Sequence, residues 1–591
     1  MVRTRGLLSL FPSDLMRSML RLLPLAAVLL VAGAASAQTT TQSCPATPAV
    51  CQITNGQTIN NVIRGDTTST GARKNLDRVY ELARDGIYLM DADIRNTNYH
   101  LRIYGATGGG ALPEIYTSLN PNSGNRVGDA FGQEGDITFR DFVFAGVLPA
   151  GFGGELPNMS VTFVRVRNPG FDLVMDGVIA VNLQAQIIRA QAALRKFEMT
   201  NSMWINSGWL GQNGTNFGAG KGIDLRDGSI DSLVFRNNTF VNYTDRIIRH
   251  RSSTGPIRVM IFDHNTILNA VSYHGTLALG QVGETIRITN NLFVDSFVAG
   301  ADTSDIVRQS EFDESGEVYA NGKAKMTWIL SEPNTTTNWV VSNNYYHVSP
   351  SVQAFYTTYG NGSGDDGNPD NGTDGDNDII GAGAPLTDHI RGRIANPDAA
   401  FTMADVQLTN RPAAPVAMVT WYRTPKANGG AGRTKDVDTF DPATDDYDRR
   451  DVDYFTDTFD ASYPITSPAY IGGSGACPAG DLNWFPARYA VCSSLTVANE
   501  GPVEGRVFEL TNAPNPFGGA TTVRFTLPEA GTATLAVFDA LGRQVATLAE
   551  GPMAAGPHEV RWAAADAAPG VYVVRLQAGD RVGTHRVLVV R

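Results

Sequence analysis

The sequence predicts an all-β chain, in which a parallel β-helix solenoid is followed by a small immunoglobulin-like β-sandwich. Three observations lead to this expectation. A short apolar phrase ending in asparagine recurs along the chain, 61 of the 591 residues are glycine, and closely spaced strand-like segments fill the C-terminal region. The formal net charge of −12 argues against a nucleic-acid-binding protein, which would carry a basic stripe.

Residues 1–37 have the features of a secretory signal peptide. Four arginines precede the apolar run "LLPLAAVLLVAGAA", and Ala35-Ser36-Ala37 offers a small-residue cleavage site before Gln38. A short membrane anchor is the alternative, but the run is shorter than a bilayer-spanning helix. We therefore expect an exported, monomeric mature chain with no transmembrane segment, and Met16 or Met19 as alternative start sites.

The four cysteines form two local pairs. Cys44 and Cys51 lie in an N-terminal segment, residues 38–75, and Cys477 and Cys492 lie far downstream. An oxidising compartment favours the disulfides Cys44–Cys51 and Cys477–Cys492. A metal site is the weaker alternative, because neither spacing is CxxC and no histidine lies nearby.

The recurring phrase predicts the solenoid. It occurs as "FVRVRNPGF", "FEMTNSMWIN", "LVFRNNTFVN", "MIFDHNTILN", "IRITNNLFVD" and "VVSNNYYHV", with a weaker copy, "ITFRDFVF". Alignment places in one column Asp141, Asn168, Ser202, Asn238, Asn265, Asn291 and Asn344. The steps of 27, 34, 36, 27, 26 and 53 residues are typical of a repeat architecture.

Stacked coils explain buried asparagines. Equivalent positions of successive coils lie about 4.8 Å apart, so the amides of one column can bond from coil to coil. We therefore predict a ladder of Asn168, Asn238, Asn265, Asn291 and Asn344 in a β-helix over residues 76–395. A β-sandwich would accept such strands but gives no reason for the column.

The ends of the solenoid should be capped. Residues 56–110 fit an N-terminal cap and first coils, and residues 396–495 fit an irregular C-terminal cap that contains Ser467-Pro468-Ala469 and Gly480-Asp481…Trp484. This layout resembles the right-handed, pectate-lyase-like β-helix proteins over roughly residues 56–495. The resemblance implies the fold and the handedness, and says little about a substrate.

Residues 361–381 contain a partial calcium-loop pattern. Asp374, Asp376 and Asp378 alternate, but Ile379 stands where glycine is required and Pro385 where the bidentate glutamate belongs. A solvated loop is the simpler interpretation. The sequence indicates no certain cofactor and leaves Ca²⁺ as a candidate.

A linker over residues 496–509 separates the solenoid from a C-terminal domain, residues 510–591. The strands of this domain carry "PNPF", "VFDALGRQV", "GPHEVRW" and "GVYVVRL". These motifs resemble the C-terminal sorting domain of the type IX secretion system. The resemblance implies outer-membrane translocation by that machinery, followed by release or surface attachment. An ordinary immunoglobulin-like binding module is the alternative.

Ionisable side chains concentrate in residues 242–275, and they are the candidate site. The arginines can grip carboxylates of an extracellular acidic polysaccharide, the histidines can act as bases near neutral pH, and the tyrosine is a candidate acid. The candidate substrate-binding residues are Arg246, Arg249 and Arg251, and the candidate catalytic residues are His250, Tyr273 and His274. A charged, solvated face is the alternative.

Two functions of different classes remain open. The first is a polysaccharide-degrading enzyme, with a uronic-acid lyase as the leading expectation. The second is a non-catalytic surface adhesin or glycan-binding β-helix. The ionisable cluster favours the first, whereas the lack of a clear carboxylate pair or calcium cage favours the second.

Overall fold

A computed structural model describes most of the chain. The described residues are 41–149, 158–208, 220–226, 228–250, 255–272, 275–298, 327–329, 335–360, 385–386, 388–424, 428, 459–498, 510–515, 517–527, 530–539, 543–564, 567–578 and 581–590. They form two compact units, Met1–Thr496 and Val497–Arg591.

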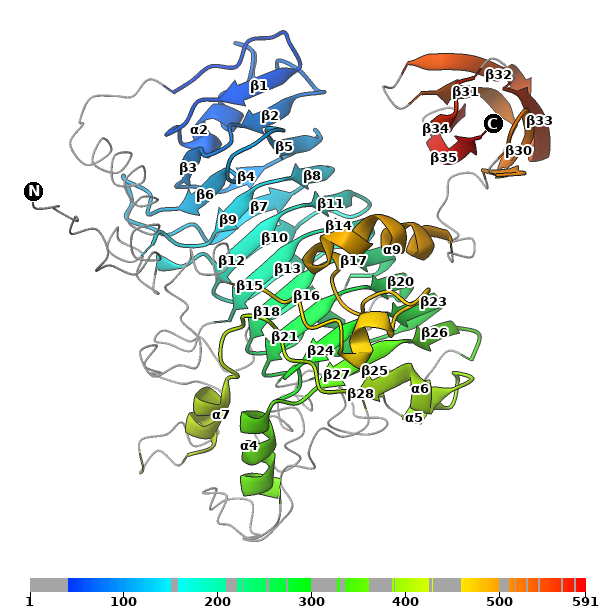
Figure 1. Ribbon diagram of the computed structural model, residues 1–591. Helices are drawn as coiled ribbons and strands as arrows, with labels where there is room; N and C mark the ends of the chain where they lie inside the picture. The colour runs from blue at the N-terminus through cyan, green and yellow to red at the C-terminus, as the bar shows by residue number, and fades with distance from the viewer. Residues whose placement is uncertain are drawn as a thin grey trace, which may run out of the picture. The chain divides into compact units, whose positions relative to one another are not determined.

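The first unit is built on three long sheets in which all the paired strands are parallel (Figure 1). Sheet 1 contains in spatial order β1 (Val50–Ile53), β2 (Val79–Leu82), β5 (Leu101–Gly105), β8 (Ile137–Arg140), β11 (Asp172–Asp176), β14 (Leu194–Thr200), β17 (Ile230–Arg236), β20 (Ile257–Asp263), β23 (Val282–Thr289) and β26 (Asn338–Ser342). Sheet 2 contains β4 (Ile94–Arg95), β7 (Asp129–Gln133), β10 (Thr162–Val166), β13 (Gln186–Ala190), β16 (Lys221–Arg226), β19 (Ile248–His250), β22 (Leu277–Leu279) and β25 (Thr327–Ile329). Sheet 3 contains β3 (Ile87–Met90), β6 (Glu114–Thr117), β9 (Val143–Ala145), β12 (Ile179–Leu183), β15 (Met203–Ser207), β18 (Thr239–Tyr243), β21 (Thr266–Ala270), β24 (Leu292–Val294), β27 (Asn344–His347) and β28 (Phe401–Met403).

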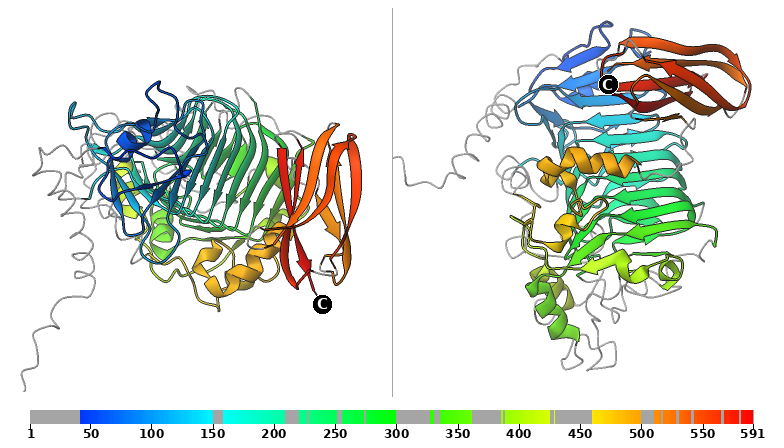
Figure 2. Two further views of the ribbon diagram at one scale, coloured as in Figure 1. Left: turned by 90° about the horizontal axis from the view of Figure 1, so that it is seen from above. Right: turned by 45° about the vertical axis from the view of Figure 1, so that its right-hand side comes forward.

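Each coil passes from sheet 1 to sheet 3, then to sheet 2, and returns to sheet 1 one strand further along. The stacked strands follow one another in Figure 2. The predicted parallel β-helix is confirmed. Its strands run from Val50 to Met403 and so extend beyond the predicted range of residues 76–395 at both ends.

The corner between sheets 1 and 3 contains the repeated asparagines. Nδ2 of Asn238 donates to Oδ1 of Asn265 (3.0 Å), Asn265 Nδ2 donates to Asn291 Oδ1 (3.1 Å), and Asn291 Nδ2 donates to Asn344 Oδ1 (2.8 Å). All four residues are fully buried. Each amide oxygen also accepts the backbone N–H of the ladder residue before it, as Asn265 Oδ1 does from Asn238 N. The ladder therefore satisfies both main-chain and side-chain groups inside the corner.

Two members of the aligned column lie elsewhere. Asn168 is exposed and follows β10 in sheet 2, so its assignment to the ladder is corrected. Asp141 precedes the ladder position by one residue, because β8 pairs with β11 through Arg140 and Asp176. The phrase that contains Asn168 therefore belongs to a strand of another sheet, and Phe142 occupies the ladder position next to Asp141. Ser202 does occupy the column, and its backbone N–H donates to Asn238 Oδ1.

The residue before each ladder position has left-handed backbone geometry. Asn201, Asn237, His264, Asn290 and Asn343 have φ between 50° and 59°. Asparagine adopts this conformation more readily than most residues because its short polar side chain can bond locally. The doubled asparagines of the repeat thus combine a turning residue with a ladder residue.

A second asparagine ladder lies at the other end of the sheet 3 strands. Asn206 Nδ2 donates to Asn182 Oδ1 (2.9 Å), Asn242 Nδ2 to Asn206 Oδ1 (2.8 Å), and Asn269 Nδ2 to Asn242 Oδ1 (3.0 Å). These four residues also have positive φ and are fully buried. The two ladders fix the register of the coils at both edges of sheet 3.

The interior between the sheets is a continuous apolar core. Aromatic rings stack along it, with Trp204 packed edge-on against Phe235 and Phe240, and Phe240 stacked on Phe262. The short helices of this unit are α2 (Ile59–Arg64), α4 (Pro350–Gly360), α5 (Asp388–Arg391), α6 (Pro397–Ala400), α7 (Val416–Arg423), η4 (Pro468–Ile471), η5 (Leu482–Trp484) and α9 (Pro486–Ala498).

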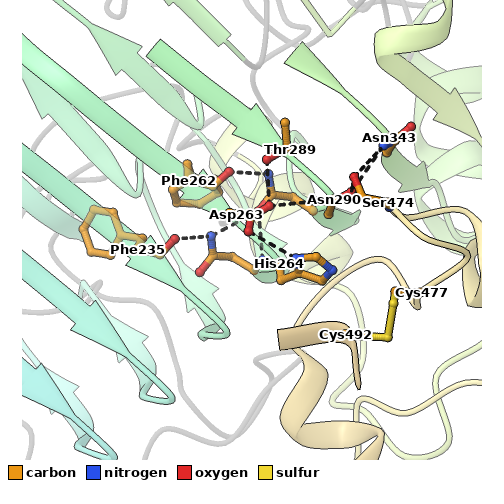
Figure 3. Close-up of polar contacts among 12 residues, drawn as sticks. Phe235, Phe262, Asp263, His264, Thr289, Asn290, Asn343, Ser474, Cys477 and Cys492 are labelled. Carbon is orange, nitrogen blue, oxygen red and sulfur yellow. Dashed lines mark hydrogen bonds and ion pairs between the residues drawn. A yellow bond between two sulfur atoms is a disulfide. The ribbon is translucent and has the colours of Figure 1, made fainter. Parts of the chain in front are cut away.

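Residues 459–485, which we call the strap, lie along the outer face of sheet 3 and the adjacent ladder corner. Phe459, Tyr463 and Phe485 share a second apolar cluster with outward residues of sheet 3. Gly480 N donates to Asn290 O (2.7 Å), and its φ of +91° and close approach to Thr266 exclude a larger residue. The strap therefore covers the corner between sheets 1 and 3 and shields it from solvent (Figure 3).

Both predicted disulfides are confirmed. Cys44–Cys51 closes a loop at the N-terminal end, and Cys477–Cys492 joins the strap to α9. Among the described residues, no helix has the length and apolar character needed to cross a membrane. Disulfides of this kind are consistent with an extracellular protein.

The second unit is a small β-sandwich. One antiparallel sheet contains β29 (Thr511–Ala513), β30 (Ala520–Leu527) and β33 (Gly556–Ala563), and the other contains β32 (Gln544–Met553), β31 (Gly531–Phe538), β34 (Gly570–Ala578) and β35 (Arg581–Val589). Its core includes Val523, Leu535 and Val574, which face inward by strand alternation.

Candidate functional site

The outer face of sheet 2 carries a row of arginines. Strand pairing places in register Arg95, Gly132, Arg165, Arg189, Asp224 and Arg249, on the strands from β4 to β19. Neighbouring strands lie about 4.8 Å apart. We call Arg95, Arg165, Arg189 and Arg249 the arginine row. Like charges in register across a sheet are unfavourable, so the row requires compensation.

Carboxylates compensate part of this charge. Asp129 Oδ2 lies 2.7 Å from Arg165 Nη1 and 3.1 Å from Arg167 Nη2. Arg249 Nη1 lies 3.1 Å from Asp224 Oδ1. The side chain of Arg95 is 53% exposed, that of Arg165 24% and that of Arg249 11%, so the row becomes more buried along the solenoid.

Arg189 is the least compensated member of the row. Its side chain is partly buried, its Nε has no hydrogen-bond partner among the described residues, and no ion pair holds it there. Burial lowers the pKa of Arg189, and the positive charges of Arg226 and Arg165 lower it further. The negative charge of Asp224 acts in the opposite direction and raises it. A bound anion would relieve this unfavourable field.

Asp224 shows how strongly positive the face is. The carboxylate is almost fully buried, which opposes ionisation. Arg249 and Lys221 nevertheless hold the pKa of Asp224 below its usual value, with a hydrogen bond from Arg249. The positive charges around Asp224 therefore outweigh burial, which alone would raise its pKa.

The structure places three of the predicted site residues beside this row. Arg249 and His250 lie on β19, and Arg246 precedes that strand. Arg246 is almost fully buried, with Nε 3.2 Å from Asp245 Oδ2, and Lys221 Nζ contacts the same oxygen at 3.0 Å. His250 is fully buried. These positions suit structural ion pairs and core packing, and the imidazole is sequestered from solvent.

The other predicted site residues lie outside the described residues. They are Arg251, Tyr273 and His274, and the calcium-loop pattern of residues 361–381 is outside as well. The roles expected for these three residues stay predictions. Within the described residues, no group of three His, Cys, Asp or Glu side chains is arranged to hold a metal ion.

A buried polar cluster lies where the strap meets the ladder corner (Figure 3). Asp263 accepts hydrogen bonds from Thr289 Oγ1 (2.7 Å) and Asn290 Nδ2 (2.8 Å), and His264 Nδ1 lies 3.3 Å from its Oδ2. Burial raises the pKa of Asp263, but His264 and these hydrogen bonds outweigh that effect and lower the pKa below its usual value. The cluster is covered by the strap, so it holds the strap in place and is closed to a polymer.

Asp481 belongs to the same strap contact. Thr239 Oγ1 donates to its Oδ2 (2.7 Å), and Asn483 N and Nδ2 donate to its Oδ1 (2.9 and 2.7 Å). Trp484 Nε1 donates in turn to Thr239 Oγ1 (2.9 Å). Burial raises the pKa of Asp481 to about 6, and the hydrogen bonds limit the rise.

A groove of about 980 Å³ lies between α4 and the chain that leaves β28. Its polar lining includes His347, Gln353, Asp405 and Arg411. Arg411 Nη2 is occupied by Asn269 Oδ1 and Asp295 Oδ2, both at 2.7 Å, and so closes the second ladder. The guanidinium group of Arg411 therefore already makes structural contacts within the protein.

The sequence contained a signal for the arginine row that the asparagine alignment missed. "QIIRA" at residues 186–190 and "RIIRH" at 246–250 repeat the same Ile-Ile-Arg phrase. Arg189 and Arg249 are the arginines of these phrases, and each aligns with Asp224 on the strand between them. An alignment of the segment that follows each ladder phrase would have found the row.

No protein-family model matches the chain, and no curated protein matches it. The chemistry of the site is therefore argued from its own geometry. Guanidinium groups stay charged at any working pH and bind oxyanions through two parallel hydrogen bonds. A repeated, partly exposed row of them is suited to a ligand with repeated negative charges.

Proposed function

We propose that this protein is a secreted or cell-surface β-helix that binds extracellular anionic polysaccharide along the outer face of sheet 2. The observation that carries the proposal is Arg189, a partly buried guanidinium between Arg165 and Arg226 with no ion pair in the described part of the chain. The protein as a whole carries a net charge of −12, so general attraction to polyanions does not explain such a row.

An extended polymer matches the shape of the face. The row follows the stacking direction of the strands, so a polymer laid along the solenoid would pass its arginines in turn. Each contact is a charge-assisted hydrogen bond, for which the net stabilisation is about 1.5–3 kcal/mol. Several such contacts supply useful affinity even when each is partly screened by salt.

The lyase expectation receives less support than binding. Elimination requires a base and an acid that reach the sugar. His250 is fully buried, and Tyr273 and His274 lie outside the described residues. A uronic-acid lyase thus remains the alternative proposal, and unsaturated product released from the bound polymer would be its signature.

Sequence features at the N- and C-terminal ends of the chain support the proposal that the protein is exported. The signal peptide of residues 1–37 and the likeness of residues 510–591 to a type IX sorting domain support Sec export followed by outer-membrane translocation. The two disulfides fit that route because they form in oxidising compartments. Deletion of residues 510–591 should retain the protein in the periplasm, and unchanged export would contradict the sorting role.

The binding proposal is tested with two polyanions on one backbone. Dextran sulfate and carboxymethyl dextran should both bind the full chain, with neutral dextran as the blank, and affinity should fall as salt is raised. Arg189→Gln should weaken binding by about 1.5–3 kcal/mol. Arg140→Gln, an exposed arginine on sheet 1, is the matched control and should change nothing.

Two results would overturn this proposal. One is the absence of binding to either polyanion at low salt. The other is an equal loss of affinity in Arg189→Gln and Arg140→Gln, which would indicate a general charge effect. Ultraviolet absorbance of the same mixtures reports any unsaturated product and decides between binding and elimination.

A further inference from the structure

Gly132 is the only glycine among the six register positions from Arg95 to Arg249. It lies on β7, between Arg95 on one neighbouring strand and Arg165 on the other. A Cβ atom at this position would meet Arg167 Nε at 2.9 Å and Arg95 Cγ at 3.0 Å. The side chains of Arg95 and Arg167 therefore lie across bare backbone, and this proximity depends on the missing Cβ.

Arg165 completes a set of three guanidinium groups. Arg165 and Arg167 contact the same oxygen of Asp129, at 2.7 and 3.1 Å, so their guanidinium groups are neighbours. Arg95 is oriented through Nε by Asp93 at 2.9 Å. Asp129 thus positions two arginines and Asp93 positions one, and Arg165 Nε also donates to Gln191 Oε1 at 3.0 Å.

Two of these three arginine side chains are partly exposed. The side chains of Arg165 and Arg167 are 24% and 28% exposed, which keeps them within reach of a ligand. Arg167 Nε is buried and has no hydrogen-bond partner among the described residues. That donor lies over Gly132 beside the side chain of Arg95, and the guanidinium group of Arg167 meets that of Arg165 at Asp129.

We infer that Arg95, Arg165 and Arg167 form a cradle over Gly132 for a sulfate ester group of the bound polysaccharide. This inference rests on the proposed function and names its ligand class. A carboxylate presents two oxygens in one plane and is matched by one bidentate guanidinium. A sulfate ester presents three terminal oxygens in different directions, and three guanidinium groups from different strands and turns can each take one.

The same pair of polymers tests the cradle when their charge densities are matched. The intact protein should prefer dextran sulfate to carboxymethyl dextran by about tenfold, the effect of one charge-assisted hydrogen bond. Arg167→Gln should remove most of this preference. Arg167→Lys keeps the charge but loses the planar fork, and it should also lose most of the preference.

Gly132→Ala is a test that retains every charge. The added Cβ displaces Arg95 and Arg167, so affinity for dextran sulfate should fall at least about fivefold while carboxymethyl dextran is affected less. Circular dichroism checks that each variant is folded. Inorganic sulfate should compete with dextran sulfate more effectively than acetate does at equal ionic strength.

The outcomes separate this inference from the proposed function. Equal affinity for the two polymers, or an equal loss for both in Arg167→Gln, would overturn the sulfate cradle and leave polyanion binding intact. Unchanged dextran sulfate affinity in Gly132→Ala would also overturn the cradle. If neither polymer binds the intact protein, the proposed function itself fails.

Discussion

Replacement of Asn265 by alanine should destabilise the solenoid strongly. Its amide takes part in four hydrogen bonds: Nδ2 donates to Asn291 Oδ1 and Phe235 O, and Oδ1 accepts from Asn238 N and Nδ2. The side chain is fully buried, so water cannot replace these partners. The deletion therefore leaves polar groups unsatisfied inside the corner.

The size of the destabilisation by Asn265→Ala depends on which hydrogen-bond partners of Asn265 keep a second hydrogen bond. Asn238 Nδ2 still donates to Met199 O, and Asn291 Oδ1 still accepts from Asn265 N. Asn238 N and Phe235 O lose the bond with the side chain of Asn265. At about 1–3 kcal/mol for each buried unsatisfied group, the free energy of unfolding should fall by about 2–6 kcal/mol.

Urea unfolding followed by tryptophan fluorescence measures this change, because Trp204 is buried inside the neighbouring coils. Asn168→Ala is the matched control, since Asn168 is exposed and outside the ladder. The control should stay within about 0.5 kcal/mol of the natural protein. Equal midpoints for Asn265→Ala and Asn168→Ala would refute the reasoning.

Three further predictions concern the strap and the buried histidine. The pKa of Asp481 is raised from 3.8 to about 6 in the folded protein, so its contribution to stability should be greatest at low pH and be lost as pH rises from about 4 to 6. Asp481→Asn should remove this component, and a difference from the natural protein that does not vary with pH would contradict it. Reduction of Cys477–Cys492 should weaken protection of the strap amides against hydrogen exchange by about 3 kcal/mol, with little effect on β13, and equal loss in both would argue against a local clip. His250→Ala should lower the free energy of unfolding by about 1–3 kcal/mol and leave polyanion affinity unchanged, whereas loss of polysaccharide turnover without loss of stability would support the lyase alternative.

Much of the solenoid could be predicted because its stabilising groups are local in the repeat. Each doubled asparagine holds both the turning residue and the ladder residue in one dipeptide, as at Asn290 and Asn291. A residue in this position makes the same contacts in every coil. The pattern therefore survives in the sequence even where the coil length changes from 26 to 53 residues.

The earlier coils were harder to align for a physical reason. There the ladder position is filled by apolar or small groups, and Val178 N donates to Ser202 Oγ instead of to an amide. Without an asparagine to mark the corner, the alignment took Asp141, one residue before the ladder position, and Asn168, which follows a strand of sheet 2. The second ladder was missed although its members follow each ladder phrase by a constant four residues, as Asn242 follows Asn238 and Asn269 follows Asn265.

The candidate site was only partly predictable because charge compensation depends on the neighbouring coil. Arg246, Arg249 and Arg189 look alike in the sequence, as arginines in apolar strands. The structure gives Arg246 the carboxylate of Asp245 and gives Arg249 that of Asp224, whereas Arg189 receives no such partner among the described residues. Which arginine remains available to a ligand is therefore set by strand register.

The same dependence on strand register distinguishes the outer face of sheet 2 from that of sheet 1. Along one register row of sheet 1, oppositely charged residues lie on neighbouring strands, with Arg140 beside Asp176 and Arg236 beside Asp263. Opposite charges on neighbouring strands stabilise each other and leave little net field for a ligand. On sheet 2 the row repeats one sign at Arg165 and Arg189 on neighbouring strands, where Asp129 compensates Arg165 but no ion pair compensates Arg189 within the described residues. Because Arg189 has no ion pair among the described residues, an external anion there would lower the cost of this repetition, and this is the physical basis of the proposed polyanion binding.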